Sequence, residues 1–222
     1  MNTLENGLFR VDLHVHTAFS YDGFATPEQL SRVCQRKGIT GLAITDHNTI
    51  EGALHCQRHL PFPVIVGEEV STRSGHLIGL FLKETIPPGL SMMETIARIR
   101  DQHGLVYLPH PFDRVRSSHI GDVELEQVAG LVDMVEVFNS RNLFAEANRQ
   151  ALALAQTRQS LQTVGSDAHS ASEVGNSFVE MAPFSGAEEF LLNLRGGHLH
   201  GRKTSLGWRA IMKLRKRLRG IR

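Results

Sequence analysis

The stretch from Val11 to Gly23, VDLHVHTAFSYDG, constrains the fold and the chemistry of this chain more than any other. Apolar residues alternate with Asp12, His14 and His16, so a β-strand here would place the three polar side chains on one side. Two histidines at positions i and i+2 lie about 7 Å apart along a strand, close enough to share one metal ion. Asp22 follows in a segment typical of a turn, which could return its carboxylate to the same place. A strand with a solvated polar face would show the same alternation, but the imidazoles favour a metal or catalytic site.

The rest of the chain predicts a repeated pattern of strand and helix. Apolar strands are expected at 11–15, 41–45, 64–66, 75–82, 105–108, 132–138, 163–164 and 178–181, with helices at about 26–37, 49–59, 91–103, 122–129, 143–156 and 186–195. Strands that are apolar throughout are buried on both faces, as in a parallel α/β sheet. An open doubly wound sheet is the competing layout, but no GxGxxG or GxxxxGK[ST] turn follows a strand. The polar residues of interest follow the strands, which favours a TIM-like barrel with the active site at the C-terminal ends of the strands.

Composition and charge limit the class of protein. A chain of 222 residues with 41% apolar residues is expected to form one globular domain. No apolar run is long enough to span a membrane, no secretory signal is visible, and two cysteines without CxxC spacing favour a reducing, cytoplasmic location. The formal net charge is +1, but residues 202–222 hold nine Lys/Arg and no Asp/Glu. We therefore expect a barrel domain at 1–201 and a basic C-terminal tail at 202–222.

Histidines and carboxylates recur at the ends of the predicted strands. Six of the twelve histidines and three carboxylates would converge at one barrel mouth. Such a cluster is costly to desolvate, and it repels itself when the imidazoles are protonated. Divalent ions relieve both costs, and mixed nitrogen and oxygen ligands suit zinc, manganese or iron. The residues are His14, His16, Asp22, His47, Glu69, His76, His110, Asp167 and His169.

Five short motifs carry a resemblance to a known family. DLHVHTAFSYDG, ITDHNTIEG, GEEVS, LPHP and GSDAHS, in this order, resemble the PHP (polymerase and histidinol phosphatase) family over roughly residues 10–180. The resemblance implies a distorted (β/α)7 barrel that holds up to three metal ions and hydrolyses phosphoesters. It implies a first ion at His14, His16, Glu69 and Asp167, a second at Glu69, His76 and His110, and a third at Asp22, His47 and His169.

Two of these assignments depend on details of the motifs. Glu69 is preferred to Glu68 because the family pattern resembles G-x-E, and only one of two neighbouring strand residues can face the mouth. The spacing from this glutamate to His76 varies within the family. Position 22 is a carboxylate where some members have a histidine, which would weaken the preference of the third site for zinc.

The implied mechanism is attack on phosphorus by a water activated between the two ions that share Glu69. Asp12 and Asp46 could orient ligand imidazoles, or they could serve only as strand-end and helix-cap residues. Arg116 and Arg141 are the candidates for binding a substrate phosphate or carboxylate, and their alternative is a solvated surface position.

The basic tail has its own alternatives. Apolar residues at 211, 214, 218 and 221 recur at helical spacing with Lys/Arg between them. This pattern fits a helix that packs on the barrel, or a contact with nucleic-acid phosphates or an anionic membrane surface. Trp208 is the only aromatic residue there, which weakens the case for base stacking.

The expected function is hydrolysis of a phosphomonoester or phosphodiester in a nucleotide, a short oligonucleotide or a small phosphorylated metabolite. Histidinol phosphate is a close second substrate. A metal-stabilised binding or regulatory module without turnover, and a metal-dependent amide or ester hydrolase, are the alternatives from other classes.

Overall fold

The computed structural model describes residues 7–115, 119–205 and 207–208. Arg116 and the predicted tail helix at 211–221 lie outside the described residues. No helix in the described part of the chain is long and apolar enough to cross a membrane.

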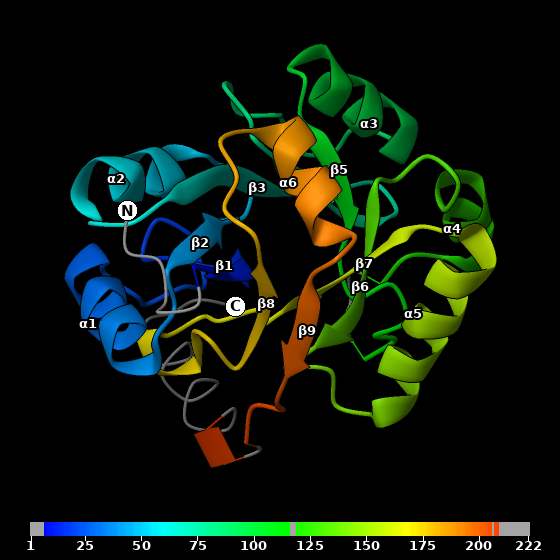
Figure 1. Cartoon of the computed structure of the whole chain (residues 1–222). Coiled ribbons are helices and arrows are strands. Elements are labelled where there is room, and N and C mark those ends of the chain that lie inside the picture. The colour runs from blue at the N-terminus through cyan, green and yellow to red at the C-terminus, as the bar shows by residue number, and fades with distance from the viewer. Residues whose placement is uncertain (1–6, 116–118, 206, 209–222) are drawn as a thin grey trace.

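Strands and helices alternate along most of the chain (Figure 1). Their order is β1 (Phe9–Val15), α1 (Pro27–Lys37), β2 (Gly41–Ile44), α2 (Glu51–His59), β3 (Val64–Thr72), β4 (Gly75–Leu80), α3 (Met92–Asp101), β5 (Leu105–Leu108), α4 (Asp122–Val128), β6 (Met134–Asn139), α5 (Ala145–Arg158), β7 (Leu161–Gly165), the 3-10 helix η1 (Ala171–Glu173), β8 (Ser177–Met181), α6 (Ala187–Leu194) and β9 (His198–Gly201).

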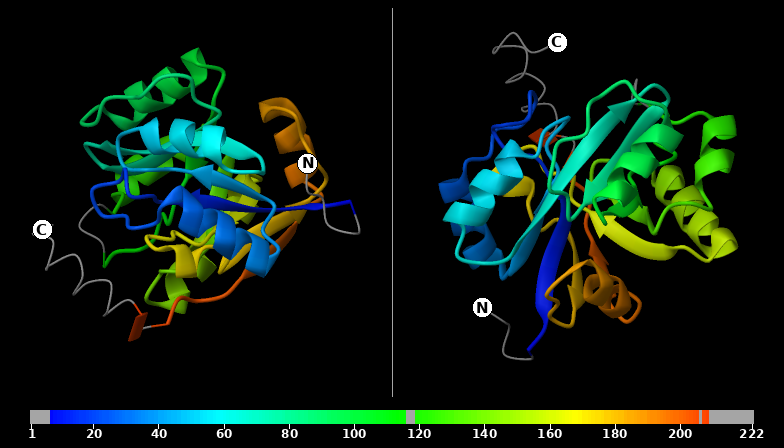
Figure 2. Two further views of the ribbon diagram at one scale, coloured as in Figure 1. Left: turned by 90° about the vertical axis from the view of Figure 1, so that its left-hand side faces the viewer. Right: turned by 90° about the horizontal axis from the view of Figure 1, so that it is seen from above.

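The nine strands of the described residues form one curved sheet in the order β7-β6-β5-β4-β3-β2-β1-β8-β9. The pairs β1–β2, β2–β3, β5–β6 and β6–β7 are parallel, whereas β4, β8 and β9 pair antiparallel with their neighbours. Just beyond β7, Ala168 bridges to Val15 of β1, and the Ala168 carbonyl accepts a hydrogen bond from His16 N (2.8 Å). These contacts bring the sheet close to a closed barrel, with helices around its outside (Figures 1 and 2).

The predicted fold class, an α/β barrel of distorted TIM type, is therefore confirmed. The exact count of seven β/α units is not confirmed, because β3 and β4 form a hairpin without an intervening helix and β8 and β9 add antiparallel strands. Strand β9 was not predicted from the sequence, and β3 extends beyond the expected 64–66.

Local sequence signals explain where the helices begin. Thr26 caps α1 through a reciprocal pair of hydrogen bonds with Gln29, and Pro27 occupies the first turn. Ser91 and Glu94 form the same capping box at α3. Gly38 ends α1 in the left-handed conformation that a Cβ disfavours.

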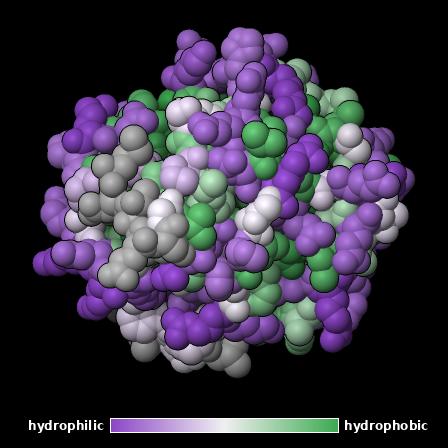
Figure 3. All heavy atoms as spheres, in the orientation of Figure 1, coloured by the Kyte–Doolittle hydropathy of each residue, from purple (hydrophilic) through white to green (hydrophobic). Residues whose placement is uncertain are grey.

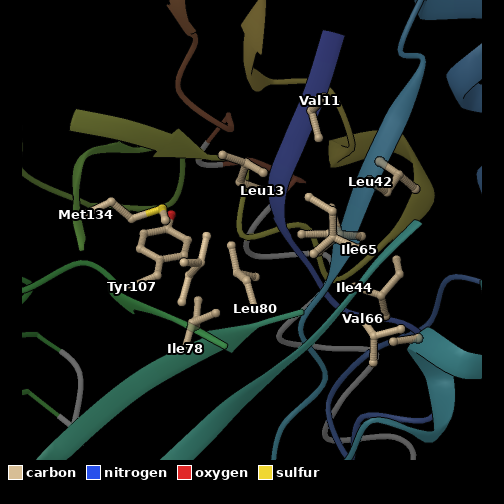
Figure 4. Close-up of a cluster of buried hydrophobic side chains, with 14 of the residues drawn as sticks. Val11, Leu13, Leu42, Ile44, Ile65, Val66, Ile78, Leu80, Tyr107 and Met134 are labelled. Atoms are coloured by element: carbon tan, nitrogen blue, oxygen red, sulfur yellow. The ribbon is translucent and has the colours of Figure 1, made fainter. Parts of the chain in front are cut away.

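The main core joins neighbouring strands of the sheet. Figure 4 shows buried side chains that come from β1 to β6, among them Leu13, Ile78, Leu80 and Tyr107, which are almost fully buried. Burial of each such side chain favours folding by about 1.5–3 kcal/mol. The outer face shown in Figure 3 is mostly hydrophilic, with scattered hydrophobic side chains.

Helix α6 covers the end of the barrel at which the parallel strands begin. Its Phe190 is fully buried and packs edge-to-face on Phe81 and Phe184, with ring centroids 5.6 and 5.1 Å away. Phe9, the first residue of β1, contacts Phe184 in the same way. Because this aromatic cluster lies at the beginning of β1, the opposite end of the barrel is left for the polar residues that follow the strands.

Candidate metal centre

The structure brings all nine predicted metal-ligand residues together at the C-terminal end of the barrel. They fall into overlapping groups whose nitrogen and oxygen atoms lie within 4.8 Å of one another, and all but the partly buried His76 are buried. The groups are His16, Asp22, His47 and His169; His14, His16 and Glu69; His14, His110 and Asp167; and His47, Glu69 and His76.

Glu69 lies at the middle of the cluster. Its Oε2 is 3.2 Å from the Nε2 atoms of both His14 and His16. Its Oε1 is 2.7 Å from Nδ1 of His76 and 3.0 Å from Nε2 of His110. One buried carboxylate thus faces two pairs of imidazoles, one pair through each oxygen.

Glu68 turns away from this cluster. Its Oε2 accepts a hydrogen bond from the backbone N–H of Ile86 (2.8 Å), and burial raises the pKa of Glu68 to about 7. The alternation of side chains along β3 explains why only Glu69 faces the cluster.

Asp22 forms a second focus with two further histidines. Its Oδ2 is 2.8 Å from Nε2 of His169, and its Oδ1 is 3.8 Å from Nε2 of His47. Asp167 lies between the two foci, with Oδ1 3.5 Å from Nε2 of His16 and 3.4 Å from Nδ1 of His169. The turn after β1 therefore carries Asp22 back to the histidines that follow the other strands.

The charges in the cluster shift several pKa values in opposite directions. Burial raises the pKa of Glu69, but His47, His76 and His14 outweigh it and hold that pKa well below its usual range. Burial lowers the pKa of His14, yet Asp167, Glu136 and Glu69 raise it well above its ordinary value. Burial lowers the pKa of His47 to about 4. The centre thus combines an ionised carboxylate with imidazoles of very different basicity.

Two buried histidines provide a test of whether the cluster fits metal ions. Within the described residues, neither ring nitrogen of His16 nor Nδ1 of His47 forms an aligned hydrogen bond, although Nε2 of His16 faces the carboxylates of Glu69 and Asp167. A buried polar atom without a partner is destabilising, whereas coordination of a cation by the imidazole lone pair satisfies it. The donor set, six imidazoles and three carboxylates, fits divalent transition metals.

Glu136 is a residue of the centre that the sequence reasoning missed. Its Oε1 lies 3.0 Å from Nδ1 of His14 and accepts a hydrogen bond from the Tyr107 hydroxyl (2.6 Å). Its Oε2 accepts hydrogen bonds from the His110 backbone N–H (2.8 Å) and from Nδ2 of Asn139 (2.9 Å). A single acid inside the apolar run MVEVFN was the available signal.

The carboxylates of Asp12 and Asp46 accept hydrogen bonds from backbone N–H groups rather than from imidazoles. Asp12 accepts hydrogen bonds from the N–H groups of Ser166 (3.1 Å) and Gly175 (2.8 Å). Asp46 accepts hydrogen bonds from the backbone N–H (2.5 Å) and the hydroxyl (2.7 Å) of Thr17. Among the described residues neither carboxylate is hydrogen-bonded to an imidazole, and Asp46 does not cap α2, whose N-cap residue Ile50 makes no side-chain cap hydrogen bond.

Arg141 lies beside the second focus. Its guanidinium nitrogen Nη1 is 3.5 Å from the Asp167 carbonyl oxygen and 3.9 Å from Oε1 of Glu173. Burial and then the charge of Arg141 lower the pKa of His169 to about 3. At the rim, the ring of Tyr21 stacks on that of His47 with centroids 4.9 Å apart, and Tyr21 is 57% exposed.

The protein is an α/β-barrel protein with a candidate metal centre, because its nearly closed barrel carries a buried cluster of histidines and carboxylates at the strand ends. The PHP domain family matches residues 12–162, and the PHP-associated family matches residues 145–199. The chain belongs to the PHP family, which confirms the resemblance carried by the sequence motifs.

Individual relatives agree with this assignment. The chain is 40% identical to an uncharacterized protein of Methanocaldococcus jannaschii, over 78% of this chain and 70% of that one. It is 26% identical to a 5′-3′ exoribonuclease of Haemophilus influenzae, over 61% of this chain and 55% of that one. A two-domain protein of Bacteroides vulgatus, containing a predicted PHP-like metal-dependent phosphoesterase, shares the fold with a TM-score of 0.71. The two sequences are 16% identical, and the match covers 91% of this chain and 67% of that one.

Proposed function

We propose that this protein is a metal-dependent phosphoesterase whose substrates are nucleotides or short oligonucleotides. The observation that carries the proposal is the position of Glu69, whose two carboxylate oxygens face two separate pairs of imidazoles. A carboxylate placed in this way could be shared by two metal ions.

The ligand sets are part of the proposal. His14, His16, Glu69 and Asp167 would hold one ion, Glu69, His76 and His110 a second, and Asp22, His47 and His169 a third. Zinc, manganese and iron are the proposed ions. When bound, such ions polarise a phosphoryl oxygen and lower the pKa of a coordinated water toward neutrality.

The protein's own residues prepare the centre for this chemistry. Glu136 accepts a hydrogen bond from Nδ1–H of His14, so that Nε2, 3.2 Å from Glu69, is the nitrogen that would bind an ion once it has lost its proton. Arg141 places a positive charge beside Asp167 and His169, where it would bind a phosphate group of the substrate. Tyr21 offers an exposed aromatic surface at the rim of the same centre.

The preference for nucleic-acid substrates is supported by the similarity to an exoribonuclease and by the basic residues that follow position 201. Histidinol phosphate is included in the test below because it is the second substrate expected from the sequence. The cytoplasmic location expected from the sequence also stays a prediction.

The test combines metal analysis with a substrate panel. Purified protein is expected to contain zinc, manganese or iron, and to release products from some of the nucleoside bisphosphates, short RNAs and phosphomonoesters, including histidinol phosphate, when Mn²⁺ is added. Absence of bound metal together with absence of hydrolysis across the panel contradicts the proposal. Bound metal without hydrolysis supports instead the binding-module alternative.

His14→Ala removes one of the imidazoles that face Glu69, and we expect it to abolish hydrolysis and lower the metal content. His59→Ala is the matched control, because His59 is an exposed residue at the end of α2 and should leave both quantities unchanged. Full activity of the His14→Ala variant would show that the ligand assignment is wrong.

A further inference from the structure

A cavity of about 470 Å³ opens between α1 and the segment that contains η1. Figure 1 shows these two elements side by side at one edge of the barrel. Among the described residues that line the cavity, none carries a carboxylate. Its walls include the aromatic rings of Phe24 and Trp208, the guanidinium groups of Arg32 and Arg36, and the hydroxyl of Ser170.

The two arginines of the cavity are available for a ligand. Arg32 and Arg36 are exposed and lie one helical turn apart on the same face of α1. Within the described residues, neither guanidinium forms a hydrogen bond or an ion pair. A pair of unpaired cations on the wall of a cavity is suited to bind a phosphate group.

Trp208 also lines a smaller cavity of about 260 Å³. Arg202 and Lys203 contribute to its lining, so each of the two cavities that share Trp208 has two cationic residues in its wall. Glu173 also lines the smaller cavity, but it is 1% exposed and accepts hydrogen bonds from Ser170 and from the His169 backbone. The result is a track of positive charge interrupted by one aromatic ring.

The indole ring of Trp208 is fixed in place. Its Nε1–H donates a hydrogen bond to Oγ of Ser170 (3.1 Å), which in turn donates to Oε2 of Glu173 (2.9 Å). Because the edge of the ring is held, its position in the wall of both cavities does not depend on a bound molecule. A fixed ring loses little conformational entropy when a planar group stacks on it.

The larger cavity begins next to the metal centre. Ser170 directly follows His169, and the backbone N–H of Phe24 donates a hydrogen bond to the His169 carbonyl (2.9 Å). Both loops emerge from the barrel end that carries the histidine cluster. A chain of nucleotides bound in the cavity could therefore continue into the centre.

We propose that the two cavities and the ring of Trp208 form a binding groove for single-stranded nucleic acid. Arg32 and Arg36 bind backbone phosphates, and a base stacks on the indole. This inference rests on the proposed function, because it assigns the groove to the part of the substrate that extends beyond the scissile phosphate. Single strands suit such a site because every base has a flat face to stack, while the phosphates provide affinity that depends on salt.

The sequence provides a selective probe of this groove. Trp208 is the only tryptophan of the chain, so tryptophan fluorescence reports on the groove alone. Titration of the full-length protein with a short oligothymidylate, in EDTA to prevent hydrolysis, is expected to quench this emission in a saturable way. Unchanged emission over a concentration range in which the oligothymidylate is bound would overturn the proposal.

The variant Arg32→Ala/Arg36→Ala tests the phosphate contacts. We expect it to bind oligothymidylate about 10-fold or more weakly, and to reduce the slope of log affinity against log salt by about 1.4, the value for two phosphate contacts with a single strand. Arg58→Ala/Arg98→Ala is the matched control: it removes the same charge from exposed positions on α2 and α3. Equal affinities of the two double variants would overturn the proposal.

Competition by inorganic polyphosphate separates base recognition from attraction of charge alone. We expect polyphosphate to displace oligothymidylate only at much higher phosphate concentration, because it has no bases to stack. Equal competition would overturn the assignment to nucleic acid. Since all of these measurements are made without turnover, a protein that binds oligothymidylate but hydrolyses nothing would contradict the proposed function and leave the groove supported.

Discussion

Glu136 connects three strands at the C-terminal end of the barrel. From β6 it contacts the side chains of His14 on β1 and Tyr107 on β5, and it also accepts the backbone N–H of His110. The Tyr107 hydroxyl can only donate to a carboxylate, so the Glu136 oxygen that it shares with His14 acts as an acceptor for both. This arrangement keeps the proton on Nδ1 when the His14 ring is neutral, and it directs Nε2 toward Glu69.

Glu136→Gln is expected to weaken metal binding while leaving the fold in place. The amide of Gln has nearly the same shape as the carboxylate. It has only one acceptor oxygen, whereas the donors around Glu136 now contact two. Loss of a carboxylate that orients a ligand histidine lowers metal affinity by about 10–100-fold. Competition with a chromogenic chelator measures this affinity.

Glu84→Gln is the control for Glu136→Gln, because Glu84 is exposed and belongs to none of the groups of candidate ligands. Equal metal affinity of the two variants would show that Glu136 does not position His14. A melting temperature close to that of the unchanged protein, measured with the metal removed, would confirm that the Glu136→Gln variant folds.

Single residues also show where sequence reasoning succeeded and where it did not. Histidines were recognisable because six of them recur in short motifs at the ends of successive predicted strands. Glu136 was not, because one acid between valines carries no spacing pattern. The role of Asp12 could not be settled either, since the pairing register of β1 with β2 shifts between Asp12 and Val15 and strict alternation fails there.

Side chains from β1, β5 and β6 lie close to Gly165 at the end of β7. A Cβ at this position would lie 2.5 Å from Cβ of His14 and would overlap Oε1 of Glu136. It would also come within 3.2 Å of the Tyr107 hydroxyl. The backbone of β7 can therefore approach β1, where the sheet nearly closes, only because the residue has no side chain.

Gly165→Ala is expected to destabilise the protein by about 1–3 kcal/mol, the typical cost of forcing extra volume into a packed region. It should also lower metal affinity, because the new methyl group displaces His14 or Glu136. Denaturant unfolding and chelator competition measure the two effects.

The control for Gly165→Ala is Gly130→Ala, since a Cβ at Gly130 would have no atom within 4 Å. We expect this substitution to change neither the stability nor the metal affinity by a comparable amount. Similar unfolding curves for the two variants would contradict the inference that close strand packing at Gly165 excludes a side chain.

At the scale of elements, helices were more predictable than strand pairing. The start of α1 follows from Thr26 and Pro27, and that of α3 from Ser91, because these caps act locally. Strand β9 (His198–Gly201) is short, largely exposed and polar, so it carries no periodic signal and exists only through its pairing with β8. Pairing partners are set by distant parts of the chain, which a local pattern does not contain.

The molecule as a whole divides its two barrel ends between stability and chemistry. The end under α6 is closed by aromatic packing around Phe190, whereas the other end gathers nine polar side chains, eight of them buried. The order of motifs predicted the barrel and placed these nine residues at one mouth. Strands were predicted at 75–82 and 178–181, but the antiparallel pairing of β4 and β8 and the whole of β9 were not, and these make the sheet irregular.

Metal removal is expected to lower the stability of the whole protein. The buried nitrogens of His16 that form no aligned hydrogen bond within the described residues remain unsatisfied in the apo form. Any ion that binds the folded chain selectively adds stability of about 2.7 kcal/mol at a concentration 100-fold above its dissociation constant. Thermal unfolding in EDTA should therefore occur at a lower temperature, and added Zn²⁺ or Mn²⁺ should restore the unfolding temperature in a concentration-dependent way.

The His16→Ala variant should respond less to added metal than the His59→Ala control, because only the first removes a nitrogen that faces Glu69. If EDTA leaves the unfolding temperature of the unchanged protein unaltered after its metal content has fallen to zero, the cluster is stable without ions and the metal-centre proposal fails.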